Sequence, residues 1–184
     1  MPTSSSKLKA FDSSIRDEDL PSIIEVLQKG ALGFGPNVAE FENQFTSFSH
    51  KSYNIATNSA SAAAYMIFAY LFALKGPCEV YTTSLGFTSP AWAARQNGHR
   101  VIFVDVNKNL QFSTTSYKQK RAATSLQEPS LPVVLMPVLY GGVSEIEDFE
   151  PYGDEIVVVD SAHCVTPTIK SDFVFFSFHP YKPI

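Results

Sequence analysis

The sequence carries little charge, and the charge that it carries has no positive excess. It has 14 Lys and Arg residues against 18 Asp and Glu residues, which gives a formal net charge of −4, and its lysines are scattered along the chain. Proteins that bind nucleic acid or an anionic membrane surface usually show a basic patch or stripe. We therefore expect neither nucleic acid nor a membrane as a partner.

Cysteines and long apolar runs are also scarce. Cys78 and Cys164 lie far apart and form no Cys-x-x-Cys pair, which favours buried thiols in a reducing compartment and leaves a disulfide open. We expect no metal in the site. The longest apolar stretch, residues 60–74, is too short to cross a bilayer and is better explained as a buried helix. The polar start of the chain lacks the apolar core of a secretory signal, so the sequence predicts a cytoplasmic protein.

The residues that are present suit one packed domain. Of 184 residues, 45% are hydrophobic and 13% aromatic, which is enough to bury a single sizeable core. Residues 1–16 are predicted to be a loose lead-in, and residues 17–184 to form the domain. An early Pro21, acidic residues around it and a following Gly30 predict a helix over residues 17–29.

Beyond that helix, predicted helices and strands alternate. The spacing of Phe41, Phe45 and Phe48 predicts a helix after a Gly-rich loop, whereas residues 108–130 lack a strong period and are expected to be a connection. Further helices are predicted at residues 59–74 and 89–97. Strands are predicted at residues 53–57, 79–82, 100–106, 133–139, 156–160 and 173–178. Because most strands are apolar throughout, the predicted fold class is α/β, a mainly parallel sheet with helices on both faces.

Chemically useful residues follow several predicted strands, at the ends where open α/β sheets bind ligands. The Ser59-Ala60-Ser61 turn opens a helix, whose free N–H groups and positive dipole end suit a phosphate. Asp160 can keep the nitrogen of a bound heterocycle protonated, and Phe87 can stack on a flat ring. Lys182, if partly desolvated, becomes a nucleophile toward an aldehyde.

Each of these residues also has an ordinary structural explanation. Ser59 is a common N-cap residue, and an aspartate after a strand usually caps a loop. Phe87 would then be a core residue, and Lys182 a solvated one. The order of the residues carries the prediction, because a phosphate turn, an aromatic residue, an acid and then Ser177, five residues before Lys182, all follow strands.

Several stretches resemble the DegT/DnrJ/EryC1/StrS family of pyridoxal-phosphate (PLP) aminotransferases. The resemblance runs from residue 33 to residue 184 and spans about the first half of a family member. The last matching stretch is the most specific, because it carries the family's lysine. The matching stretches are Gly35-Pro36 with Val38 and Phe41-Glu42, residues 56–63, Phe87, residues 137–141, Asp160-Ser161-Ala162-His163, and residues 176–184 (Phe-Ser-Phe-His-Pro-Tyr-Lys-Pro-Ile).

The resemblance implies the large domain of a fold-type I PLP-dependent transferase, with pyridoxal 5'-phosphate as cofactor. Lys182 would hold PLP as a Schiff base and later move a proton, and Asp160 would meet the pyridine nitrogen. The enzyme would transfer an amino group from an amino acid to a keto-sugar nucleotide and would form a homodimer. The cofactor-binding residues implied are Ser59, Ala60, Ser61, Phe87, Asp160, His163 (near the ring hydroxyl), Ser177 and Lys182.

The sequence departs from the family in three places. Ala60 and Ser61 stand where the family has Gly and Thr, which keeps the backbone donors and a hydroxyl. Residues 107–130 match poorly. The sequence ends at Ile184, before the family's small C-terminal domain, so we expect the natural chain to continue.

Three alternatives to the aminotransferase therefore stay open. One is a catalytically incompetent fragment, or a non-enzymatic half-protein of the same fold. Another is a related PLP-dependent sugar dehydratase, which is disfavoured because such relatives have histidine where Lys182 stands. The third is a doubly wound nucleotide-binding domain, which would need a Gly-x-Gly-x-x-Gly turn where residues 57–62 contain no glycine.

Overall fold

The computed structural model describes residues 15–30, 32–124, 131–138, 149–151, 153–164 and 170–182. Some predicted features lie outside this part of the chain. They are most of the lead-in, residues 139–141 of the family motif, and the closing Pro183-Ile184.

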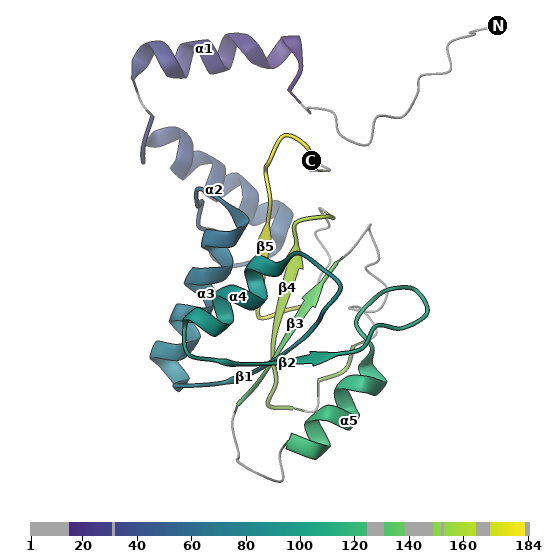
Figure 1. Ribbon diagram of the computed structural model, residues 1–184. Coiled ribbons are helices and arrows are strands. Elements are labelled where there is room, and N and C mark those ends of the chain that lie inside the picture. The colour runs from purple at the N-terminus through teal and green to yellow at the C-terminus, as the bar shows by residue number, and fades with distance from the viewer. Residues whose placement is uncertain are drawn as a thin grey trace, which may run out of the picture.

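Five strands form a single sheet in the order β2-β1-β3-β4-β5 (Figure 1). Every neighbouring pair of strands is parallel, so the predicted parallel sheet is confirmed. Strands β3 and β4 lie inside the sheet and are buried along almost their whole length, which explains their uninterrupted apolar sequences. The strands are β1 (Glu79–Thr83), β2 (Arg100–Val104), β3 (Pro132–Pro137), β4 (Ile156–Ser161) and β5 (Phe173–Phe176).

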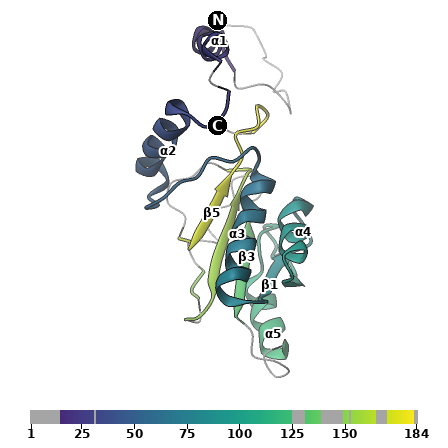
Figure 2. The same cartoon turned by 90° about the vertical axis from the view of Figure 1, so that its left-hand side faces the viewer.

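Helices cover both faces of this sheet, as predicted (Figures 1 and 2). Phe68 of α3 and Ala94 of α4 share a core with Leu135 on one face. On the other face, Tyr117 of α5 packs in a core with Met136. Leu135 and Met136 are adjacent in β3, so alternate side chains of one strand supply the two cores. The helices are η1 (Asp17–Asp19, a 3-10 turn), α1 (Leu20–Lys29), α2 (Pro36–Ser49), α3 (Ala60–Lys75), α4 (Thr88–Gln96) and α5 (Thr114–Thr124).

Helix α1 stands away from the sheet in both views (Figures 1 and 2). Pro21 in its first turn and Gly30 at its end, with φ 68°, bound it as the sequence predicts. None of its residues is buried. Within the part of the chain that the structure describes, no helix combines the length and the apolar character that a membrane span requires.

Helix α2 is joined to the end of β5 by aromatic contacts. The ring of Phe45 lies 5.2 Å from that of Phe176 and 5.5 Å from that of Phe178, both edge-on. Phe41 makes a similar edge contact with Phe178 at 5.2 Å. Edge-to-face pairs are a favourable aromatic geometry, so the predicted Phe stripe of this helix is used to hold the segment that leads to Lys182.

Residues 53–57 were predicted to be the first strand, and this prediction is wrong. Tyr53 and Ile55 are 89% and 68% exposed. The backbone N–H of Ala56 donates to Glu42 Oε1 over 2.7 Å, so a side chain of α2 replaces a neighbouring strand as the acceptor. The alternating pattern was present, but no described strand lies beside it to form a ladder.

The strand predicted at residues 100–106 is shorter and less buried than expected. It ends at Val104 and forms β2, the edge of the sheet, where Phe103 is 53% exposed. An apolar run does not distinguish an edge strand from a central one, because the same β-branched and aromatic residues favour both.

The region predicted as a connection, residues 108–130, contains helix α5. Only Tyr117 of this helix is buried. A helix that buries a single residue shows almost no apolar period, which is why the sequence did not reveal it.

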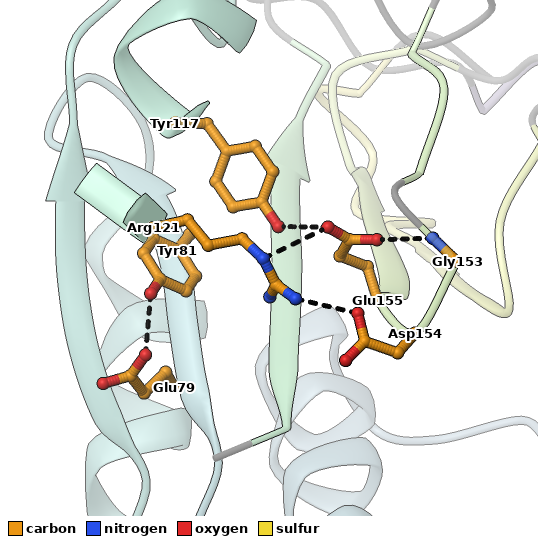
Figure 3. A network of polar contacts seen from close by, with 7 residues as sticks. All are labelled: Glu79, Tyr81, Tyr117, Arg121, Gly153, Asp154 and Glu155. Atoms are coloured by element: carbon orange, nitrogen blue, oxygen red, sulfur yellow. Dashed lines mark hydrogen bonds and ion pairs between the residues drawn. The ribbon is translucent and has the colours of Figure 1, made fainter. Parts of the chain in front are cut away.

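A polar network fastens α5 to the amino ends of the strands (Figure 3). Glu155, just before β4, accepts a hydrogen bond from the Tyr117 hydroxyl at 2.8 Å and faces Arg121 Nε at 3.6 Å. Glu79, the first residue of β1, accepts from the Tyr81 hydroxyl at 2.7 Å. Both carboxylates are buried, and each is satisfied by hydrogen bonds and an arginine.

Both cysteines are free thiols, Cys78 buried and Cys164 half-buried. The disulfide that the sequence left open is therefore not formed.

Candidate active site

The residues that the sequence singled out lie in one cleft. It has a volume of about 1450 Å³ and opens at the carboxyl ends of β3, β4 and β5, with one wall formed by the free edge of β5. This is the end of a parallel sheet where ligands are expected. All eight predicted site residues line it: Ser59, Ala60, Ser61, Phe87, Asp160, His163, Ser177 and Lys182.

The start of α3 presents backbone donors to this cleft. The Oγ of Ser59, the N-cap, accepts a hydrogen bond from the N–H of Ala62 at 3.1 Å. The N–H groups of Ala60 and Ser61, in the first turn, have no carbonyl partner within the helix. Thr57 Oγ1 holds the turn by donating to the carbonyl of Ser59 at 2.9 Å. Backbone N–H groups of this kind suit an anion.

Asp160 lies near the end of β4 and is 7% exposed. Its Oδ1 accepts a hydrogen bond from the N–H of Ala162 at 3.0 Å. Burial raises the pKa of the Asp160 carboxyl to about 6, against the opposing effects of the Ala162 N–H and of the charge on Lys182. A buried carboxylate of this kind favours a protonated nitrogen beside it, because the pair replaces a costly isolated charge.

Lys182 follows β5 in a tight turn. Its backbone N–H donates to the carbonyl of His179 at 2.8 Å, and the N–H of Tyr181 donates to His179 Nδ1 at 3.3 Å. The positive charge of Lys182 acts on two neighbours. It opposes the rise that burial causes in the pKa of Asp160. The pKa of His163 is lowered mainly by burial and further by the charge of Lys182. Lys182, Asp160 and His163 therefore line the same cleft.

Phe87 is not a core residue. It is the N-cap of α4 and is 68% exposed, with its ring on the cleft. A large aromatic side chain that is exposed inside a cleft is available for a flat ligand.

The cleft also contains residues that the sequence did not single out. Lys51 Nζ donates to the carbonyl of Ser171, and burial lowers the pKa of this lysine while Asp172 raises it. Asp172 Oδ2 accepts from the N–H of Val157 at 2.8 Å, which ties the start of β5 to β4. Ser89 lines the cleft as well. None of these residues lies in a recognisable motif, so only the fold reveals them.

This set of groups fits PLP. The start of α3 offers donors for its phosphate, the buried Asp160 an acceptor for its ring nitrogen, and Lys182 an amine for its aldehyde. The exposed ring of Phe87 matches a flat heterocycle. The cleft thus offers a group of matching chemistry for the phosphate, for the ring nitrogen and for the aldehyde of the cofactor.

Comparison with known families agrees with this geometry. The model of the DegT/DnrJ/EryC1/StrS aminotransferase family matches residues 13–184. The chain belongs to this family. Its membership confirms the resemblance that the motifs indicated.

Two bacterial proteins have related sequences. The spore coat polysaccharide biosynthesis protein SpsC of Bacillus subtilis (strain 168) is 29% identical, over 91% of this chain and 44% of that protein. A UDP-4-amino-4,6-dideoxy-N-acetyl-beta-L-altrosamine transaminase of Campylobacter jejuni is 27% identical, over 93% of this chain and 47% of that protein. The chain thus spans about half the length of the curated relatives it matches.

Solved structures share the fold. The PLP form of the sugar aminotransferase Spr1654 of Streptococcus pneumoniae superposes with a TM-score of 0.78 at 20% identity, covering 95% of this chain and 50% of that one. The E. coli GDP-4-keto-6-deoxy-D-mannose-3-dehydratase superposes with a TM-score of 0.70 at 24% identity, covering 84% and 40%. The predicted fold-type I large domain is confirmed, and the fold alone accommodates both an aminotransferase and a dehydratase.

Proposed function

We propose that this chain is the cofactor-binding part of a PLP-dependent sugar aminotransferase. The observation that carries the proposal is the gathering of all eight predicted residues around one cleft, where the charge of Lys182 acts on the buried Asp160. Residues from four separate stretches of sequence meet there, and each suits a different part of the same cofactor. Membership of an aminotransferase family supports the same conclusion.

PLP is the cofactor, and this chain's residues divide the work of binding it. Ser59, Ala60, Ser61 and Ser177 would hold the phosphate. When bound, PLP supplies an electron sink that lets an amino group pass between two carbon skeletons. Asp160 keeps the proton on the ring nitrogen, which that role requires.

The remaining cleft residues orient the ring and move protons. Phe87 would cover one face of it and exclude water there, and His163 would lie near the ring hydroxyl. Lys182 Nζ would hold the aldehyde carbon. Lys182 Nζ, which lines the cleft with Asp160 and His163, would also act as the acid and base that moves a proton.

The proposed substrates are an amino acid as donor and a keto-sugar nucleotide as acceptor. Related proteins carry names of this chemistry: the Campylobacter relative is a transaminase of a UDP-linked amino sugar. A second Bacillus subtilis relative, 28% identical over 90% of this chain and 38% of that protein, is a 3-oxo-glucose-6-phosphate:glutamate aminotransferase. Its name supports an amino-acid donor and a keto-sugar acceptor, which in that protein is a sugar phosphate and not a nucleotide. Transamination is preferred over dehydration because Lys182 stands where the related dehydratases have histidine. The homodimer and the cytoplasmic location stay predictions.

Borohydride trapping tests the binding role. The 184-residue chain is mixed with PLP, reduced, digested and analysed by mass spectrometry. We expect a reduced adduct on Lys182, lost in Lys182→Ala and kept in Lys51→Ala, the matched variant of another lysine in the same cleft. An equal yield of adduct in Lys182→Ala would show that the assignment is wrong.

A single-turnover measurement separates the enzyme from an incompetent fragment. Addition of glutamate to the PLP-loaded chain should release up to one equivalent of 2-oxoglutarate per chain and remove the trappable adduct. An adduct that forms on Lys182 without release of keto acid would favour the non-enzymatic alternative.

A further inference from the structure

Two serine side chains from different helices meet inside the cleft. Ser61 Oγ donates a hydrogen bond to Ser89 Oγ over 2.7 Å, although the two residues are 28 positions apart in the sequence. Both residues line the cleft and both are partly buried. Ser61 is one of the predicted phosphate-binding residues, whereas Ser89 has no assigned role.

The positions of the two serines are equivalent. Ser61 is the second residue of α3, and Ser89 is the second residue of α4. The N-caps that precede them are Ser59 and Phe87, which the proposed function assigns to the phosphate and to the ring. The hydroxyl pair therefore joins the two helix starts on which the cofactor would rest.

The two serine hydroxyls have one proton left to donate to a ligand. Each hydroxyl has one proton to donate and can accept through its lone pairs. Ser61 gives its proton to Ser89, so its hydroxyl cannot at the same time donate to a phosphate. In the described part of the chain, the Ser89 hydroxyl has no hydrogen-bond partner except Ser61, which leaves its own proton for a ligand in the cleft.

We propose that Ser89 is a further phosphate-binding residue, and that Ser61 and Ser89 act as one unit that donates a single hydroxyl proton to the cofactor phosphate. The inference rests on the proposed function, because it assumes that PLP occupies the cleft. It changes the expected role of Ser61, whose hydroxyl supports Ser89 rather than donating alone. A charge-assisted hydrogen bond of this kind is stronger than one between neutral groups.

The test measures dissociation constants of PLP and of pyridoxal, which lacks the phosphate, for the full 184-residue chain. We expect Ser89→Ala to weaken PLP binding by about tenfold to a hundredfold, as for loss of a hydrogen bond to a charged group. Pyridoxal binding should change by less than about twofold. Ser89→Thr, which keeps the hydroxyl, should bind PLP nearly as the parent chain does.

The double variant tests whether the serines act together. If they form one unit, the double variant Ser61→Ala with Ser89→Ala should lose little more PLP affinity than the single variant that binds PLP more weakly, because the effects of coupled residues are not additive. Losses that multiply would show two independent contacts and overturn the pair.

The outcomes distinguish this inference from the proposed function. Wild-type affinity for PLP in Ser89→Ala, or an equal loss of PLP and pyridoxal, would overturn the inference while trapping at Lys182 still stood. Failure of the parent chain to give a PLP adduct on Lys182 would overturn both.

Discussion

The hydroxyl of Tyr117 donates to Glu155 Oε1 over 2.8 Å in the interior of the protein (Figure 3). The side chain of Glu155 is fully buried, and its second oxygen accepts from the N–H of Gly153 at 3.2 Å. Burial, together with this carboxylate, raises the pKa of Tyr117, so the tyrosine remains a hydrogen-bond donor at any ordinary pH. The pair lies at the amino ends of the strands, the opposite edge of the sheet from the cleft.

This arrangement predicts a stability effect without an effect on the site. Tyr117→Phe should lower the free energy of unfolding by about 1–3 kcal/mol, because a buried carboxylate loses a partner. Urea denaturation measures it, with Tyr53→Phe as the control, since Tyr53 is 89% exposed. The yield of PLP adduct on Lys182 in the folded variant should equal that of the parent. Identical unfolding curves for Tyr117→Phe and Tyr53→Phe would contradict the role assigned to the pair.

Asp160 makes the cofactor-free protein less stable at neutral pH. Burial raises its pKa from 3.8 to about 6, so the folded state binds the proton more tightly than the unfolded state. Stability gained from the protonated form is complete below about pH 4 and is lost as the pH rises to about 6. The shift corresponds to at most about 3 kcal/mol, at roughly 1.4 kcal/mol per pKa unit.

Asp160→Asn should remove this dependence. The amide oxygen can still accept from the N–H of Ala162, so the variant should be more stable than the parent at pH 7.5 and should bind PLP more weakly. Urea unfolding at several values between pH 4 and 7.5 measures the effect. Asp105→Asn, at the exposed end of β2, should keep the parent's dependence. A fall of stability with pH in Asp160→Asn that is as steep as in the parent would refute the burial argument.

Phe87 is expected to serve the ligand and not the fold. Because it is 68% exposed, Phe87→Leu should change the unfolding free energy of the cofactor-free chain by less than about 0.5 kcal/mol. Loss of ring stacking should weaken PLP binding by about twofold to tenfold. The matched control is Trp92→Leu, which removes another exposed ring from α4 outside the residues that line the cleft. Equal PLP affinities in the two variants would argue against stacking.

The sequence predicted the sheet well where burial is complete. Strands β3 and β4 are covered on both faces, and such strands are apolar at every position. It failed where local pattern and tertiary surroundings disagree. Residues 53–57 alternate like a strand but have no strand of the described chain beside them, and α5 is a helix with Tyr117 as its one buried residue.

The sequence predicted which residues line the site, but not all of the contacts between them. The parallel order of strands places Asp160 and Lys182 at one edge, so their proximity follows from topology. The contact of Ser61 with Ser89 depends on how closely α3 and α4 pack, which no local pattern encodes. The half-buried position of Lys51 depends in the same way on its contact with Ser171, just before β5.

The Phe72 ring of α3 lies close to Gly98, which follows α4. This contact gives a final prediction, about the packing of the two helices. Gly98 has φ +82°, and a Cβ built on it would lie 2.9 Å from Cε2 of Phe72. The next residue, His99, is buried; its Nδ1 accepts from the N–H of Cys78 at 3.0 Å, and its Nε2 lies 2.9 Å from the carbonyl of Phe68. Gly98 therefore sets the turn that places this histidine between α3 and β1.

Gly98→Ala should destabilise the protein through two separable costs. The left-handed backbone costs an alanine about 1–2 kcal/mol, and displacement of the Phe72 ring adds to it. Thermal unfolding of Gly98→Ala, Phe72→Ala and the double variant separates them. Removal of the ring should leave only the backbone cost, so the double variant should be more stable than the sum of the single losses predicts. Strict additivity would mean that the ring moves aside freely and that the conformation of Gly98 alone explains the glycine.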